Sequence, residues 1–210
     1  MKTEELNFAA VDLVTSAGGN VGSMSRCLTR LGVKFQTKGN FDPPSGERPV
    51  ILPGVGAFGT VMASLNENKF SERLKAMLKG GTPFLGVCVG MQVLFDESEE
   101  APGVSGLGLV SGKVVRYRAT RVHKVPQIGW NKIVACREMT GDIKEGFVYF
   151  VNSYYACPRE PGAISYLADY GGAFCAALQV GNFTAFQFHP EKSGDMGERL
   201  LKEWLSNVSK

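Results

Sequence analysis

The chain lacks the residues and spacings from which metal sites and disulfide frameworks are built. Its 210 residues include only two histidines and five cysteines, and no two cysteines form a C-x-x-C pair. An odd number of unpaired cysteines argues against a disulfide framework, and so few histidines argue against a zinc site. We therefore expect no metal site, and thiols that remain reduced.

Long apolar runs and an excess of one charge are missing as well. No apolar stretch reaches the roughly 18 residues that span a bilayer, and residues 1–5 (M-K-T-E-E) lack the apolar segment of a signal peptide. With 23 basic and 20 acidic residues, the net charge is only +3 and is spread along the chain. We expect a cytoplasmic protein that binds neither membranes nor nucleic acids through charge.

What the chain does have is the composition of a globular domain, with 44% hydrophobic and 20% charged residues. Its length suits one α/β domain. In the first half, short apolar runs alternate with amphipathic ones, so strands are expected at 9–15, 33–37, 50–52 and 83–87, and helices at 20–31, 57–65, 70–79 and 89–95. The second half has short strands at 114–118, 133–136, 147–151, 164–170, 174–180 and 183–188.

Two features complete the predicted fold. Gly181 and Asn182 resemble a hairpin turn, and Leu200, Leu201, Trp204 and Leu205 have the spacing of a C-terminal helix, which Asp195 and Glu198 are expected to cap. Strand–helix alternation followed by short strands predicts a mixed, mostly parallel central sheet flanked by helices.

The sharpest local signal is residues 86–90, G-V-C-V-G, between an apolar strand and a helix. A nucleophile between two glycines is typical of a tight strand-to-helix turn that presents a reactive side chain. The N-terminus of a helix favours the thiolate of Cys88, and the N–H of Val89 would point at an oxyanion. We therefore interpret Cys88 as a nucleophile. The other cysteines are interpreted as buried structural residues: Cys27, Cys136, Cys157 and Cys175.

A thiol nucleophile needs a base and a group that orients the base. His189 and Glu191 end the last apolar strand in the stretch F-H-P-E. A residue before proline is extended, and alternate residues of an extended chain point the same way, so Glu191 can orient the His189 ring. His123 lies in a basic stretch without such a partner, and we expect it in a loop.

Residues 53–59 (P-G-V-G-A-F-G) match the glycine-rich pattern of dinucleotide-binding turns. That pattern also requires a second strand that ends in an acid about 20 residues further on. A lysine-rich helix is predicted there instead, so we reject nucleotide binding. A flexible turn beside the cysteine turn can instead supply a second oxyanion N–H, from Val55 or Gly56.

Together these stretches resemble the class I, triad-type glutamine amidotransferases, whose architecture is flavodoxin-like. More narrowly, the chain is similar to the amidotransferase subunits of imidazole glycerol phosphate synthase, an enzyme of histidine biosynthesis. The resemblance runs from about Val11 to Leu205. The motifs that carry it are 86–92 (G-V-C-V-G-M-Q), 187–193 (Q-F-H-P-E-K-S), the P-G-V-G turn, 19–24 (G-N-V-G-S-M), 129–131 (G-W-N) and 150–155 (F-V-N-S-Y-Y).

The resemblance implies a glutaminase without a cofactor. Cys88 would form a thioester with the side chain of L-glutamine and release ammonia, with His189 as acid and base and Glu191 orienting it. We expect Tyr155 to be a packing residue. The resemblance implies that glutamine is bound by Gly56, Gln92, Ser153 and Tyr154.

The resemblance also implies a partner, because one amidotransferase domain has no room for the site that uses ammonia. That partner is a cyclase subunit with a (β/α)8 barrel, bound as a heterodimer. The expected interface residues are Asn20, Trp130 and Lys192. Two positions outside the triad depart from the family, which commonly has histidine in place of Gln127 and Asn152. Residues 1–8 extend beyond the family's usual start, so the predicted domain is 9–210 after a short tail.

Three alternatives stay open on the residues alone. The first is another cysteine hydrolase, which acts on peptides or esters and needs neither Gln92 nor a barrel partner. The second is a non-catalytic interaction module, and the complete Cys–His–Glu set argues against it. The third is an amidotransferase subunit of vitamin or purine synthesis, and the G-W-N stretch argues against it.

Overall fold

The structure is a computed structural model, and it describes residues 8–15, 21–40, 42–136 and 143–209. Asn20 and the first seven residues of the predicted tail lie outside the described residues. Phe8, the last residue of that tail, is partly buried against the core.

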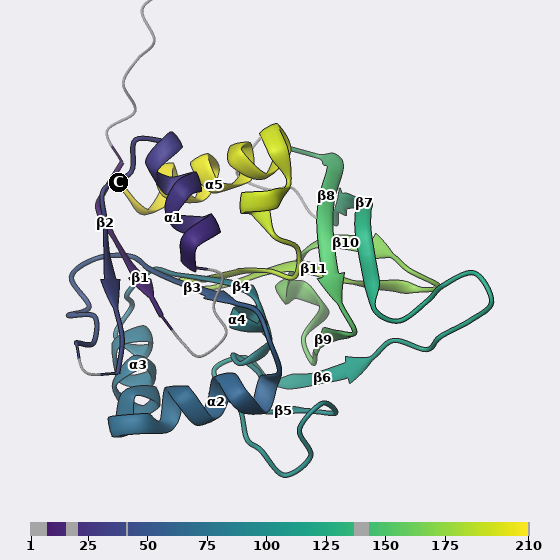
Figure 1. Ribbon diagram of the computed structural model, residues 1–210, viewed down its shortest axis with the longest axis horizontal. Coiled ribbons are helices and arrows are strands. Elements are labelled where there is room, and N and C mark those ends of the chain that lie inside the picture. The colour runs from purple at the N-terminus through teal and green to yellow at the C-terminus, as the bar shows by residue number, and fades with distance from the viewer. Residues whose placement is uncertain (1–7, 16–20, 41, 137–142, 210) are drawn as a thin grey trace, which may run out of the picture.

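A nine-stranded mixed sheet runs through the molecule (Figure 1). The strands stand in the order β2 (Phe35–Lys38), β1 (Val11–Val14), β3 (Val50–Gly54), β4 (Phe84–Cys88), β12 (Phe183–Phe186), β11 (Ala173–Val180), β10 (Ile164–Asp169), β7 (Gln127–Ala135) and β8 (Glu145–Asn152). In this order, neighbouring strands from β2 to β12 pair in parallel, and neighbouring strands from β12 to β8 pair antiparallel. The mixed sheet was expected, but its antiparallel half is as large as its parallel half because β7 and β8 extend it at one edge.

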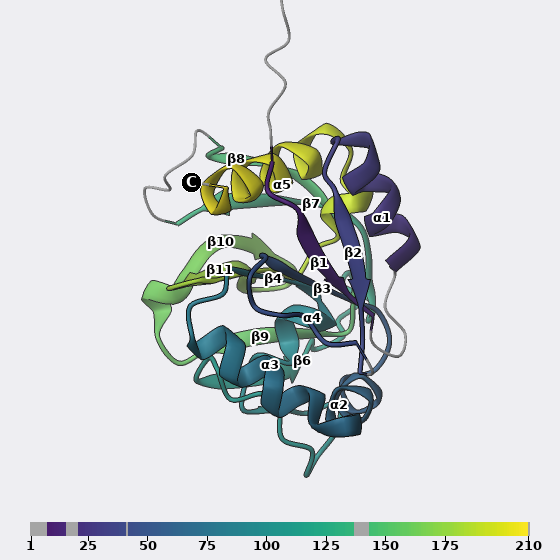
Figure 2. The ribbon, with the colours of Figure 1, turned by 90° about the vertical axis from the view of Figure 1, so that its left-hand side faces the viewer.

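Helices cover both faces of the sheet. α1 (Val21–Arg30) and α5 (Gly194–Val208) lie on one face, and α2 (Phe58–Asn66) and α3 (Phe70–Lys79) lie on the other (Figures 1 and 2). β3 and β4 between these layers are buried along their whole length, which explains their continuous apolar sequences. The predicted helix at 70–79 matches α3, whereas α4 (Val89–Gln92) ends before the predicted residue 95.

A second sheet of three short strands was not predicted. It contains β5 (Glu97–Ser98), β6 (Gly112–Arg116) and β9 (Tyr154–Pro158). The strand expected at 114–118 is β6, which pairs with β9 instead of joining the large sheet. Four of the five residues of β9 are half-buried, so its sequence shows no alternation of apolar and polar residues that would mark a strand.

Helix α5 buries the apolar stripe that its sequence predicts, including Trp204. The predicted cap by Asp195 and Glu198 is wrong, because the N-cap residue is Ser193 and its side chain makes no cap hydrogen bond. Its hydroxyl donates to the His189 carbonyl oxygen at 2.6 Å and accepts from the Tyr149 N–H at 2.9 Å. Ser193 therefore connects the start of α5 to the segment that carries His189.

Within the described part of the chain, the five cysteines form no disulfide with one another. Cys27 and Cys175 are buried as expected, and burial raises the pKa of Cys27 to about 11 and raises that of Cys175 further. The expectation is wrong for Cys136, which is exposed where the chain leaves β7, and for Cys157, which is half-buried on the small sheet. Among the described residues, the helices are too short or too polar to cross a membrane.

Candidate active site

Cys88 lies on the strand-to-helix turn that the sequence predicts, as the last residue of β4 and the residue before α4. Its φ of 55° and ψ of −110° lie in a region that non-glycine residues rarely adopt. The flanking glycines are required by close packing: a Cβ at Gly90 would collide with the Leu52 carbonyl oxygen, and one at Gly86 with the Gly90 carbonyl oxygen. The turn therefore holds Cys88 rigidly at the carboxyl edge of β4.

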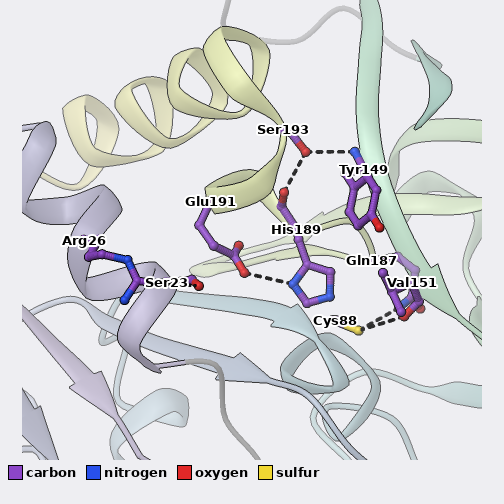
Figure 3. Close-up of polar contacts among 9 residues, drawn as sticks. All are labelled: Ser23, Arg26, Cys88, Tyr149, Val151, Gln187, His189, Glu191 and Ser193. Atoms are coloured by element: carbon purple, nitrogen blue, oxygen red, sulfur yellow. Dashed lines mark hydrogen bonds and ion pairs between the residues drawn. The ribbon is translucent and has the colours of Figure 1, made fainter. Parts of the chain in front are cut away.

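His189 and Glu191 form a buried pair close to Cys88 (Figure 3). Nδ1 of His189 donates to Oε1 of Glu191 over 2.9 Å, and the two side chains are only 2% and 1% exposed. His189 has extended backbone, as expected before Pro190. The extended conformation predicted through Glu191 is wrong, because Glu191 lies in the short helix η3 (Pro190–Lys192), although the predicted contact with His189 is present. Because Nδ1 is engaged by the carboxylate, Nε2 is the nitrogen available for proton transfer.

The charges around His189 favour its protonated ring. Burial lowers the pKa of His189, but hydrogen bonds and charge interactions with Cys88 and Glu191 raise it to about 10. The ring is therefore an imidazolium at neutral pH. An imidazolium beside a cysteine favours the thiolate, which is the reactive form of the nucleophile.

Cys88 and His189 open into a cavity of about 290 Å³. It brings together every oxyanion and glutamine-binding residue named from the sequence, and Lys192 of the expected interface set. The lining residues are Val55, Gly56, Cys88, Val89, Gln92, Glu100, Pro126, Val151, Asn152, Ser153, Tyr154, His189 and Lys192.

Glu100 is a cavity residue that the sequence analysis missed. Its Oε2 accepts the N–H of Phe58, the first residue of α2, over 2.7 Å. The sequence offers no sign of this role, because Glu100 ends a run of acidic residues that reads as a solvated surface. The structure places Glu100 on the cavity wall.

Amide side chains form a buried polar network behind Cys88. Nε2 of Gln92 donates to the Tyr154 carbonyl oxygen at 3.0 Å and to Oε1 of Gln187 at 3.1 Å. Nε2 of Gln187 lies 3.7 Å from the Cys88 sulfur. Asn152 also donates to the Tyr154 carbonyl, at 3.0 Å. The sequence analysis assigned Gln92 to substrate binding, and did not foresee that Gln187 contacts the nucleophile.

Gln127 and Asn152, the two positions where the resemblance leads us to expect histidine, are both buried. Both bond to the hydroxyl of Tyr117, which donates to Gln127 Oε1 at 3.2 Å and accepts from Asn152 Nδ2 at 3.1 Å. Tyr155 stacks on the Tyr117 ring with the centroids 4.7 Å apart, as expected of a packing residue. His123 lies in a loop and packs against Tyr170.

The outer surface of β7 and β8 carries a row of exposed apolar side chains, which we call the hairpin face. Alternation along the paired strands puts these side chains on one side of the sheet. Trp130 is 57% exposed. Among the aromatic rings that the structure describes, Trp130 packs only against that of Tyr149. The hairpin face consists of Ile128, Trp130, Val134, Phe147 and Val151. Since Val151 also lines the cavity, the hairpin face begins at the candidate active site.

An α/β sheet with a cysteine turn and a buried His–Glu pair at the carboxyl ends of its strands defines a class of thiol-dependent enzymes. Residues 15–208 match the family "Glutamine amidotransferase class-I", and the chain belongs to that family. The fold agrees with that of solved relatives. The structure titled PurLQS from Thermotoga maritima superposes with a TM-score of 0.76 at 15% identity, covering 96% of this chain and 99% of that one.

Closer relatives within the family carry the name imidazole glycerol phosphate synthase subunit HisH. The one from Thermus thermophilus is 45% identical over 194 residues, covering 90% of this chain and 93% of the relative. The one from Deinococcus radiodurans is 41% identical, covering 100% and 99%. The Arabidopsis thaliana protein named imidazole glycerol phosphate synthase hisHF, chloroplastic, is 40% identical and contains 98% of this chain within 35% of its own length.

Proposed function

We propose that this chain is the glutaminase subunit of an imidazole glycerol phosphate synthase, and that it hydrolyses L-glutamine to glutamate and ammonia for histidine biosynthesis. The observation that carries the proposal is the buried His189–Glu191 pair beside Cys88 in a cavity of about 290 Å³. The HisH relatives, similar over nearly the whole chain, support the pathway.

The proposed reaction uses the thiolate of Cys88 as the nucleophile and the protonated ring of His189 as the acid. The Cys88 thiolate attacks the side-chain carbonyl carbon of glutamine, and His189 donates its Nε2 proton to the departing ammonia. This leaves a γ-glutamyl thioester on Cys88 and a neutral ring. His189 then removes a proton from water, which attacks the thioester and releases glutamate. Glu191 keeps the ring oriented and stabilises its charged form in both steps.

Two backbone segments support the developing negative charge on the glutamine oxygen. The Val89 N–H stands at the first residue of α4, directly after Cys88. Gly54 pairs with Cys88 in the parallel register of β3 and β4, so the turn that follows it, with Val55 and Gly56, reaches the same cavity. Each preorganised donor of this kind lowers the barrier by about 3–4 kcal/mol.

Polar groups on the cavity wall suit the amino-acid end of glutamine. Both N–H groups of Gln92 are used within the network, so the atom of its amide that remains for a substrate is the acceptor Oε1. Glu100 supplies a carboxylate on the same wall. Both suit an α-ammonium group. Gly56, Ser153 and Tyr154 line the cavity with the backbone groups that suit the α-carboxylate.

Ammonia is used on a partner cyclase, which we propose to be a (β/α)8 barrel that forms a heterodimer with this chain in the cytoplasm. The Arabidopsis relative supports this pairing, because most of its length lies outside the part similar to this chain. The hairpin face is the apolar surface that would bind the cyclase. Of the expected interface residues, Trp130 lies on this face and Lys192 lines the cavity. Asn20 remains a predicted contact outside the described residues. Docking over Val151 would let ammonia pass without release.

The test is formation of imidazole glycerol phosphate by the chain mixed with the cyclase subunit of its own organism. With glutamine as the nitrogen source, we expect synthesis by the wild type and none by Cys88→Ser, because a hydroxyl is a far poorer nucleophile. With ammonium salt, both mixtures should make product. Near-normal glutamate release by Cys88→Ser would refute the nucleophile. Ester turnover by the isolated chain without any glutamine hydrolysis would favour a general cysteine hydrolase.

A further inference from the structure

The side chain of Gln187 is fully buried and lies against the nucleophile. It has no exposed surface, and its Nε2 is 3.7 Å from the sulfur of Cys88 (Figure 3). Its position follows from the sheet, in which Phe186 of β12 pairs with Val87 of β4 in parallel register. The residues that follow these two, Gln187 and Cys88, are therefore neighbours.

Alternation of the chain after β12 directs this side chain toward the site. Phe186 and Phe188 point the other way into the core, where their rings stack with centroids 4.8 Å apart. Gln187 and His189 therefore share the other side of this extended segment, and Glu191 contacts His189 from the short helix η3. His189 and Glu191 are members of the proposed triad, and Gln187 is a further polar group that this segment turns toward Cys88.

The Tyr154 carbonyl determines which atom of Gln187 faces the Cys88 sulfur, through a chain of hydrogen bonds that passes through Gln92. The Tyr154 carbonyl oxygen can only accept, so it defines which end of Gln92 is the NH₂ group. That NH₂ group also donates to Gln187, which must present its Oε1 to it. The remaining NH₂ group of Gln187 therefore faces Cys88 as a donor.

We propose that Gln187 is a positioning residue that holds the Cys88 sulfur as a thiolate through this N–H donor, with Gln92 fixing the orientation of its amide. The proposal rests on the nucleophile assigned above. A hydrogen bond to a charged acceptor is roughly twice as strong as one between neutral groups, so the donor favours the thiolate over the thiol. Because Gln187 is buried away from water, no solvent molecule replaces the donor when it is removed.

Two variants separate the two ends of the Gln187 amide. Gln187→Glu keeps an oxygen for the Gln92 donor but removes the donor toward Cys88, and Gln187→Met removes both at similar size. Gln179→Glu is the matched control, because Gln179 lies half-buried on the neighbouring strand β11 and lines a different cavity. The readout is the rate at which iodoacetamide alkylates Cys88 in the full chain at neutral pH, measured by peptide mass spectrometry. Exposed Cys136 is the reference thiol in the same sample.

We expect Cys88 alkylation to slow by at least about tenfold in both Gln187 variants, with Cys136 and the Gln179→Glu control unchanged. With the cyclase subunit present, kcat for glutamine should fall by a similar factor in Gln187→Glu while KM changes little. Cys88 alkylation near the wild-type rate in either Gln187 variant would overturn the proposal. If Cys88→Ser with the cyclase subunit releases glutamate from glutamine near the wild-type rate, the nucleophile itself is wrong, and the proposed function fails with it.

Discussion

Replacing Cys88 by alanine should return the His189 ring toward ordinary acidity, because the sulfur is one of two groups that keep the ring charged. In the wild type, burial lowers the pKa of His189 while Cys88 and Glu191 together raise it to about 10. Without the sulfur, burial is opposed by Glu191 alone. A neighbouring opposite charge typically changes a pKa by about 1–3 pH units, which is about 1.4–4 kcal/mol. We therefore expect the pKa of His189 in Cys88→Ala to fall by that amount.

The measurement is a pH titration of the imidazole ring by NMR. The chain contains only two histidines, so His123→Gln assigns the His189 signal without ambiguity. His123 packs against Tyr170 in a loop, and removing it leaves the triad contacts in place. Between the ordinary pKa of 6.5 and about 10, the wild-type ring should be protonated, and the Cys88→Ala ring should lose its proton within that range.

A pKa that remains near 10 in Cys88→Ala would refute the thiolate–imidazolium pair. The carboxylate would then account for the charged ring by itself, and Cys88 would have no electrostatic link to the base. Titration of Glu191→Gln distinguishes the two contributions, because it removes the other group that raises the pKa of His189. Cys88→Ala and Glu191→Gln should each lower the pKa of His189.

Three further predictions follow from the site. Glu191→Gln should lower kcat strongly with little change in KM, since the carboxylate acts on His189 and not on substrate; a KM effect alone would contradict this role. Val55→Pro removes one oxyanion N–H and should slow glutamine hydrolysis by roughly 10²–10³-fold even with the cyclase subunit present, and wild-type turnover would exclude that donor. Gly90→Ala should lower the free energy of unfolding in urea by about 1–3 kcal/mol through collision with the Leu52 carbonyl. Gly162→Ala, with open space around it, is the control, and equal stability of the two would argue against the close packing.

Local motifs could be predicted from the sequence because their geometry depends on neighbouring residues. The turn at Cys88 needs glycine on either side, and Glu191 lies two residues after His189, across a proline that keeps His189 extended. The alternation of apolar strands and amphipathic helices indicated the sheet and its helical layers. These features all lie within a few residues of the signal that predicts them.

Contacts that join distant segments could not be predicted in the same way. Glu100 reaches the cavity only because β5 and its neighbouring loop fold against the start of α2. β9 has no alternating pattern, and its pairing with β6 determines its place. The cap of α5 was mispredicted because Ser193 bonds to the backbone of His189 and Tyr149, segments that the helix sequence does not contain.

The parallel pairing of β4 with β12 links the stability of the fold to the chemistry of the site. In the observed register, the stacked rings of Phe186 and Phe188 fill the core while Gln187 and His189 turn to Cys88. A slip of one residue would bring a phenylalanine beside the sulfur and bury the amide and the imidazole in the apolar core. The cost of burying those polar groups without partners is about 1–3 kcal/mol each. The same alternation that packs the core therefore selects the register in which Cys88 lies beside His189.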